Sequence, residues 1–148
     1  MRPGFHGRKL AGELNKGGIN VTHYTDSSLK KAIAGADVVF SDCTSILVGG
    51  GVTGTSGFEL MVDTAHTLRI PIYVCAPSWK IDTRTVKRKD PIIYSGKIWN
   101  KAPKGIEVVV DSYDVVDSKL ITGIISELGI YPPDTFIEET RYENMWQV

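Results

Sequence analysis

A glycine-rich stretch in the first half of the sequence has residue types and spacing that could bind a phosphate. Gly49, Gly51 and Gly54 match the pattern G-x-G-x-x-G, and a helical pattern starts at Ser56. Glycines in front of a helix let backbone N–H groups approach a ligand, and the helix N-terminus favours negative charge. Two interpretations stay open: a site for a small anion such as a sugar phosphate, or a flexible loop with a tight glycine turn.

The specific nucleotide motifs fit this stretch poorly. A dinucleotide site places its glycines in the first turn between strand and helix and adds an acidic residue about 20 positions later. The strand that ends near Ala76 carries no such acid. Gly49 and Gly54 also have the spacing of a P-loop, but Thr55 and Ser56 follow them without the required lysine. The sequence therefore argues against a nucleotide-binding domain.

The histidines and cysteines show no pattern of a metal site or of an activated nucleophile. His6, His23 and His66 lack the spacing of zinc ligands. Cys43 and Cys75 both lie in apolar runs, which is typical of small buried side chains and of the reduced thiols of a cytoplasmic protein. We expect no metal and no cofactor.

The elements that must position these residues alternate between short apolar runs and helical stretches. Strands are expected over residues 19–24, 37–41, 70–76 and 106–110, the second and third of them buried on both faces. Helices are expected up to about residue 16 and over 27–34, 56–68 and 120–128, with a short helical tail after Pro132-Pro133. Asp26 or Ser27 is expected to cap the second helix. This alternation predicts a parallel sheet with crossover helices.

Residues 42–55 and 77–105 interrupt the alternation. The first segment, polar and rich in glycine, is predicted as a long loop. The second contains several proline and glycine residues and is predicted as a long excursion. Trp79 and Trp99 bracket this excursion, and we expect them to pin it to the core.

Composition and charge narrow the class of protein. A chain of 148 residues with 42% hydrophobic and 23% charged residues is long enough for one globular domain, residues 1–148. The 17 basic and 17 acidic residues cancel, which argues against DNA binding and against a membrane surface, since both need a positive field. No apolar run approaches the ~20 residues of a membrane span, so the expected location is the cytoplasm.

Several segments, taken in order, resemble a known family. They are Arg2-Pro3, Gly7-x-x-Leu10-Ala11, Gly18-Ile19-x-Val21-Thr22, Ala36-Asp37-Val38-Val39, Ile46-Leu47-x-Gly49-Gly50, Pro71-x-Tyr73-Val74-Cys75-Ala76-Pro77 and Tyr113-Asp114-Val115-Val116. Their order resembles the C-terminal domain of the family that contains the α, β and δ regulatory subunits of eukaryotic translation initiation factor 2B. The same family contains the isomerases of methylthioribose-1-phosphate and ribose-1,5-bisphosphate. The resemblance covers nearly the whole chain.

The resemblance implies a Rossmann-like α/β fold, a parallel sheet with helices on both faces, and a cleft facing a separate N-terminal helical domain. It also implies a homodimer or a hetero-oligomer with related subunits. In the family, Arg2-Pro3 follow the first strand of this domain, so that strand and the helical domain are expected to be absent. An open sheet edge of this kind invites a partner.

The resemblance also points to residues that the isomerases need. Their catalytic Asp follows the buried strand directly, and an ungapped alignment places Thr44 there, with Asp42 two residues earlier. Their Asn-Lys pair falls on Gly54-Thr55. The catalytic Cys of the enzymes lies upstream and matches neither cysteine here. A hydroxyl has no pKa suited to proton transfer, so Thr44 cannot replace the carboxylate.

The favoured hypothesis is therefore a regulatory or assembly subunit that does not act as an enzyme. It would bind a sugar phosphate or nucleotide through a candidate site made of Arg2, Ser45, Gly49, Gly50, Gly51, Gly54, Thr55 and Ser56. The alternative is a sugar-phosphate aldose–ketose isomerase, or part of one, that would use Asp42 with Thr44 and Ser45.

Overall fold

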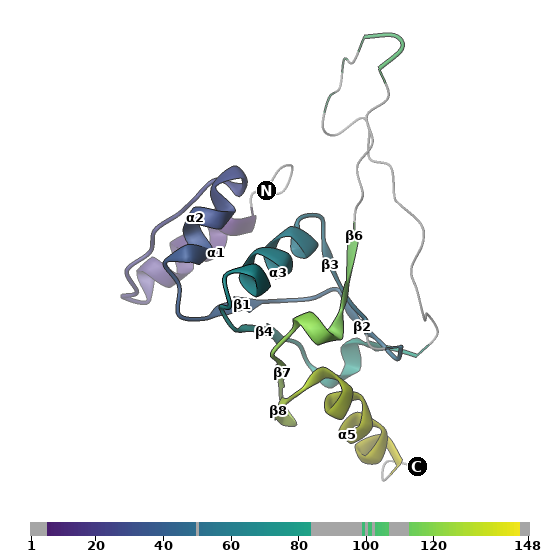
Figure 1. Ribbon diagram of the computed structural model, residues 1–148. Coiled ribbons are helices and arrows are strands. Elements are labelled where there is room, and N and C mark those ends of the chain that lie inside the picture. The colour runs from purple at the N-terminus through teal and green to yellow at the C-terminus, as the bar shows by residue number, and fades with distance from the viewer. Residues whose placement is uncertain are drawn as a thin grey trace.

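The strands of the computed structural model form two sheets (Figure 1). The structure describes residues 6–49, 51–83, 99, 101, 103–106 and 113–145. In the first sheet, β1 (Val39–Ser41), β4 (Ile72–Cys75) and β7 (Gly123–Ser126) lie parallel to one another. A fourth strand, β8 (Gly129–Tyr131), pairs antiparallel with β7.

The second sheet contains a hairpin where the sequence predicts a loop. β2 (Ser45–Leu47) and β3 (Gly51–Thr55) pair antiparallel. β5 (Ile81–Asp82) extends the sheet beside β2, and β6 (Tyr113–Asp117) extends it beside β3. The prediction of a long loop over 42–55 is therefore wrong. Its glycines hid the strand pattern, although the side chains at 52 and 53 are completely buried.

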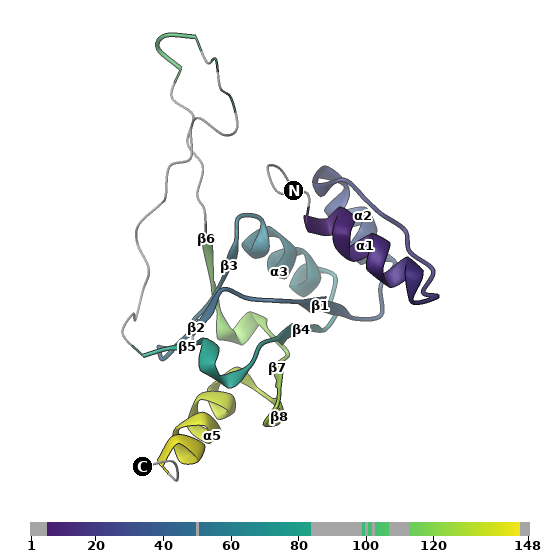
Figure 2. The same ribbon diagram turned by 180° about the vertical axis from the view of Figure 1, so that it is seen from behind.

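Helices cover both faces of the first sheet. The helices are α1 (His6–Lys16), α2 (Leu29–Ala34), α3 (Phe58–Thr67) and α5 (Pro133–Met145), and the 3-10 turns are η1 (Asp26–Ser28), η2 (Ser78–Lys80) and η3 (Ser118–Leu120). In both views α3 lies on one side of β1 and β4, and α5 lies on the other side (Figures 1 and 2). The predicted α/β fold is confirmed, and the predicted helices that correspond to α1, α2, α3 and α5 are present. Among these described residues, none of the helices is both long and apolar enough to cross a membrane.

The core lies between α3, the strands and α5. On α3, Phe58, Val62 and Ala65 are buried, as the spacing predicts, and Met61 and Leu68 pack partly buried beside them. On the other face, the largest completely buried side chain belongs to α5, at Phe136. The helices are therefore held by the apolar stripes that the sequence shows.

The predicted helix over 120–128 is wrong, because this segment forms η3, β7 and the turn into β8. Its apolar residues fall by chance at helical spacing, while a central strand covered on both faces carries a continuous apolar run. Gly123 fits between neighbouring strands, since an added Cβ would lie 3.2 Å from the carbonyl oxygen of Tyr131. Gly129, the residue after this segment, has a φ of +128° and begins β8.

The predicted strand over 19–24 is also wrong. Gly18, at a φ of +82°, ends α1 as expected, and the chain then runs to η1 without strand pairing. Its residues are exposed, and no described strand lies beside them. The segment therefore has no partner for β-sheet hydrogen bonds, although its residue types favour a strand. The predicted strand over 106–110 lies outside the described residues except for its first position.

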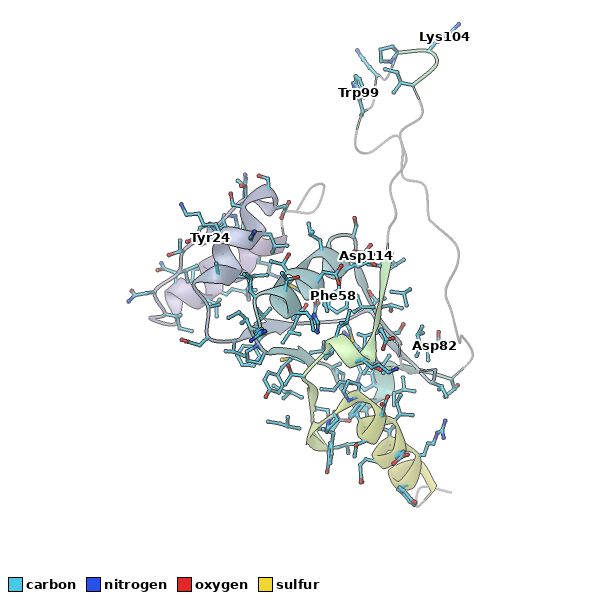
Figure 3. All side chains as sticks on the ribbon, in the orientation of Figure 1. Tyr24, Phe58, Asp82, Trp99, Lys104 and Asp114 are labelled. Carbon is cyan, nitrogen blue, oxygen red and sulfur yellow. The ribbon has the colours of Figure 1, made fainter. Side chains whose placement is uncertain are left out.

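Three expectations about burial are wrong. Phe40 is 61% exposed because β1 is an edge strand of its sheet, and its ring lies 6.2 Å from that of Tyr73. Cys75, at the end of β4, is exposed and not buried. Trp79 and Trp99 are 77% and 49% exposed, so neither anchors the excursion to the core. Figure 3 shows Trp99 far from both sheets.

Candidate functional site

A cavity of about 470 Å³ lies where the carboxyl end of β1 meets the start of α3. Ser41 and Asp42 line it from β1, Thr55 and Ser56 from the end of β3, and Asp26 from η1. Ligands of open parallel sheets bind outside the carboxyl ends of the strands, and this cavity has that position. Its apolar lining comes from Leu29, Phe58, Leu60 and Met61.

Asp42 places an exposed carboxylate at this cavity. It directly follows β1, and the Ser41 hydroxyl donates to the Asp42 carbonyl oxygen at 2.9 Å. The sequence predicts Asp42, Thr55 and Ser56 as site residues, and the structure brings all three to one cavity. Asp42 is thus the residue through which this cavity could do acid–base chemistry.

Asp26 is a site residue that the sequence reasoning missed. It was considered only as a helix cap, but Thr25 holds the N-cap position, and its hydroxyl lies 3.2 Å from those of Ser27 and Ser28. Asp26 lines the cavity together with Asp42. No local signal marks it, because the segment before it, residues 19–24, pairs with no described strand.

The start of α3 is occupied by the chain itself. Gly57 and Glu59 donate their backbone N–H groups to Asp114 Oδ2, at 2.7 Å and 3.1 Å. Figure 3 shows Asp114 beside the start of the helix, near Phe58. The glycine-rich motif suggests N–H groups that face an external phosphate. These two instead bind the Asp114 carboxylate.

Thr44 and Ser45 belong to the hairpin and do not line the cavity. The backbone N–H of Thr44 donates to the Thr53 carbonyl oxygen at 2.7 Å. The Ser45 hydroxyl lies 2.7 Å from that of Thr53, which in turn bonds the Ser45 backbone. The Ser45 hydroxyl joins β2 to β3, and the expectation that Ser45 binds a ligand stays a prediction.

The glycines of the motif serve packing and turn formation. A Cβ at Gly54 would overlap the ring of Phe58, and a Cβ at Gly51 would lie 3.3 Å from side-chain atoms of Leu47 and Val115. Gly49 stands in the exposed turn between β2 and β3. None of the three lines the cavity, and their role in ligand binding stays a prediction. Arg2 and Gly50, also predicted for the site, lie outside the described residues.

Cys43 follows Asp42, but its thiol is unreactive. It is buried, and Lys80 Nζ donates to its carbonyl oxygen. Burial raises the pKa of the Cys43 thiol to about 11, against the opposing charge of Lys80, so the thiol stays protonated near neutral pH. In the part of the chain that the structure describes, no three His, Cys, Asp or Glu side chains come together as a metal site.

Residues 1–133 match the model of the initiation factor 2 subunit family. The chain belongs to this family. The match spans nearly the whole sequence, and it confirms the resemblance carried by the motifs listed above from Arg2 to Val116.

The proteins that resemble the chain are named either as sugar-phosphate isomerases or as translation initiation factors. The chain is 34% identical over 147 positions to methylthioribose-1-phosphate isomerase of Symbiobacterium thermophilum, covering 89% of the chain and 40% of the relative. It is 31% identical over 156 positions to ribose 1,5-bisphosphate isomerase of Thermococcus kodakarensis, covering 98% of the chain and 48% of the relative. The crystal structure of translation initiation factor eIF-2B from Pyrococcus horikoshii OT3 matches with a TM-score of 0.72 and 26% identity. The match covers 92% of the chain and 48% of that structure's chain. The chain spans less than half the length of each.

Proposed function

We propose that the chain is the sugar-binding part of a sugar-phosphate aldose–ketose isomerase of the methylthioribose-1-phosphate or ribose-1,5-bisphosphate type. The observation that carries the proposal is the exposed carboxylate of Asp42 in the cavity at the carboxyl end of β1. The relatives named for these two reactions support it. This is the alternative that the sequence left open, and it now replaces the non-catalytic hypothesis as the favoured one.

The chemistry needs a group that carries a proton between the two carbons, or an acid that protonates an oxygen during a hydride shift. A carboxyl group can do either, as the base when it is ionised and as the acid when it is protonated, and Asp42 has one at the cavity. The hydroxyls of Thr55 and Ser56 are suited to bind sugar hydroxyls, which both donate and accept hydrogen bonds. Phe58 and Met61 give the cavity an apolar wall against which the carbon skeleton of a sugar could pack.

The substitution at Thr44 weighs less against catalysis than the sequence suggests. Thr44 is held in the hairpin by its bond to Thr53, and it does not line the cavity. A carboxylate at that position is therefore not needed to place an acid at this cavity. Asp42, two residues earlier, supplies one.

The phosphate of the substrate needs a partner from elsewhere. Among the described residues that line the cavity there is no lysine or arginine, and Asp26 and Asp42 make it acidic. A phosphate so placed would be repelled unless a cation faced it. Because the chain spans less than half the length of its relatives, we propose that the phosphate-binding cation and the rest of the cleft come from another segment or another chain. Arg2 stays a candidate for that cation.

The second candidate function is the regulatory or assembly subunit. The likeness to translation initiation factor eIF-2B favours it, and it would act through association with a second copy or a related subunit. Sedimentation of the purified chain tests the association. A monomer that does not associate with related subunits would contradict this candidate.

The test of the proposed function is formation of a ketose from methylthioribose-1-phosphate or ribose-1,5-bisphosphate. It is measured for the chain alone and after co-expression with the neighbouring reading frame. Ketose formation that depends on Asp42 supports the proposal. Absence of activity in both preparations, with no binding of either sugar phosphate, contradicts it.

A further inference from the structure

A second cavity, of about 310 Å³, lies at the opposite end of the parallel strands. It is formed by the end of α3, the residues that lead into β4, and η3 with the residues after it. The short turn η3 lies beside α3 in both views (Figures 1 and 2). The proposed isomerase chemistry does not involve this cavity.

The lining of this cavity is basic. His66, Arg69 and Lys119 line it, and among the described residues no acid does. Within the described residues, no carboxylate forms an ion pair with any of the three. Asp117, the nearest acid along the chain to Lys119, accepts a hydrogen bond from the Lys119 backbone N–H at 2.9 Å. Two cations, Arg69 and Lys119, gathered in a chain of zero net charge make a local positive field.

Arg69 has an unusual backbone conformation. It is the only described non-glycine residue with a positive φ, +57°. It ends α3, donating its N–H to the His66 carbonyl oxygen at 3.0 Å, while the N–H of Ile70 bonds the Ala65 carbonyl oxygen at 2.9 Å. Helices that end in this way usually have glycine at this position, because a Cβ is strained there. Strain that persists at a cavity often marks a functional residue.

Thr122 adds a neutral donor. Its Oγ1 accepts a hydrogen bond from the Ile72 backbone N–H at 3.0 Å, which leaves the hydroxyl hydrogen available to a ligand. A guanidinium binds two oxygens of one anion at once, and an ammonium adds a point charge. The combination fits a small oxyanion such as a phosphate better than an apolar ligand.

We propose that His66, Arg69, Lys119 and Thr122 form a binding site for a phosphate monoester, separate from the reaction cleft. The site stands on its own residues and does not depend on the proposed isomerase activity. A glycine at position 69 would relieve the backbone strain but would remove the guanidinium from the cavity.

The test uses the full chain with inorganic phosphate and with phenyl phosphate, each against chloride at equal ionic strength. Backbone amide chemical shifts are followed by NMR, and the melting temperature is measured in parallel. We expect saturable shifts centred on residues 66–70 and 119–122, with a Kd on the order of 1 mM. Unchanged shifts there, or shifts that rise without saturation up to about 20 mM, contradict the proposal.

Arg69→Gly gives the sharper comparison, because glycine relieves the backbone strain. We expect its melting temperature without phosphate to be higher than that of the wild type by about 2–4 °C, while its response to phosphate is lost. Lys119→Gln keeps the backbone and should weaken binding several-fold. Asp42→Asn, in the other cavity, should bind phosphate here like the wild type. An Arg69→Gly variant that responds to phosphate as the wild type does overturns the proposal.

Discussion

Asp114 accepts a hydrogen bond at 2.7 Å from the backbone N–H of Gly57, which lies 57 positions earlier in the chain. A second bond, at 3.1 Å, comes from the N–H of Glu59. A strand of the second sheet thus supplies the cap of α3, whose own N-cap residue, a glycine, has no side chain to offer. The same helix forms one wall of the candidate site, so this contact holds the wall in place.

Asp114→Ala should destabilise the protein by about 1–2 kcal/mol, because two N–H groups lose their acceptor and the helix loses a favourable charge. Urea denaturation measures the change. Asp63→Asn is the control, since Asp63 is exposed on α3 and caps nothing. Equal stability of the Ala variant and the wild type would show that water replaces the cap.

Gly54→Ala should destabilise the protein by about 1–3 kcal/mol, because the new methyl group would overlap the ring of Phe58. Denaturant unfolding followed by circular dichroism reads the loss. Gly12→Ala is the matched control: it lies in α1, where an added Cβ meets nothing within 4 Å. If both variants kept wild-type stability, the packing role of Gly54 would be refuted.

The two cysteines should differ in reactivity. At about pH 8, a thiol with a pKa of about 11 is ionised in roughly one molecule per thousand, and Cys43 is also buried. Iodoacetamide should therefore modify the exposed Cys75 and leave Cys43 unmodified, as peptide mass spectrometry would show. Denaturant should expose both, and Cys75→Ser should leave the folded chain unlabelled. Rapid labelling of Cys43 in the folded protein would contradict its burial.

Sequence patterning predicts the elements that have one clear apolar stripe. The spacing of Phe58, Val62 and Ala65 gives α3 its inner face, and Gly18 marks the end of α1. Patterning fails for β7, because a strand covered on both faces has no alternation to detect. It fails again at β3, where glycines stand in place of the side chains that would show the period.

A site residue could be predicted from the sequence only where its place directly after a strand puts it at the ligand-binding edge of the sheet. Asp42 follows a buried strand and so lies at the edge where ligands bind. The spacing of the glycine-rich motif says nothing of tertiary contacts. Gly54 is small to admit Phe58, and the N–H groups of α3 are taken by Asp114, a residue distant in the sequence. Such long-range contacts have no local signal.

The central claim is that Asp42 carries the proton in an aldose–ketose isomerisation. The most direct measurement is the rate of ketose formation by Asp42→Asn beside Asp37→Asn, an exposed acid before the other end of β1. We predict that Asp42→Asn loses about 100-fold or more in kcat while Asp37→Asn keeps the wild-type rate. Equal rates for Asp42→Asn and the wild type would contradict the account.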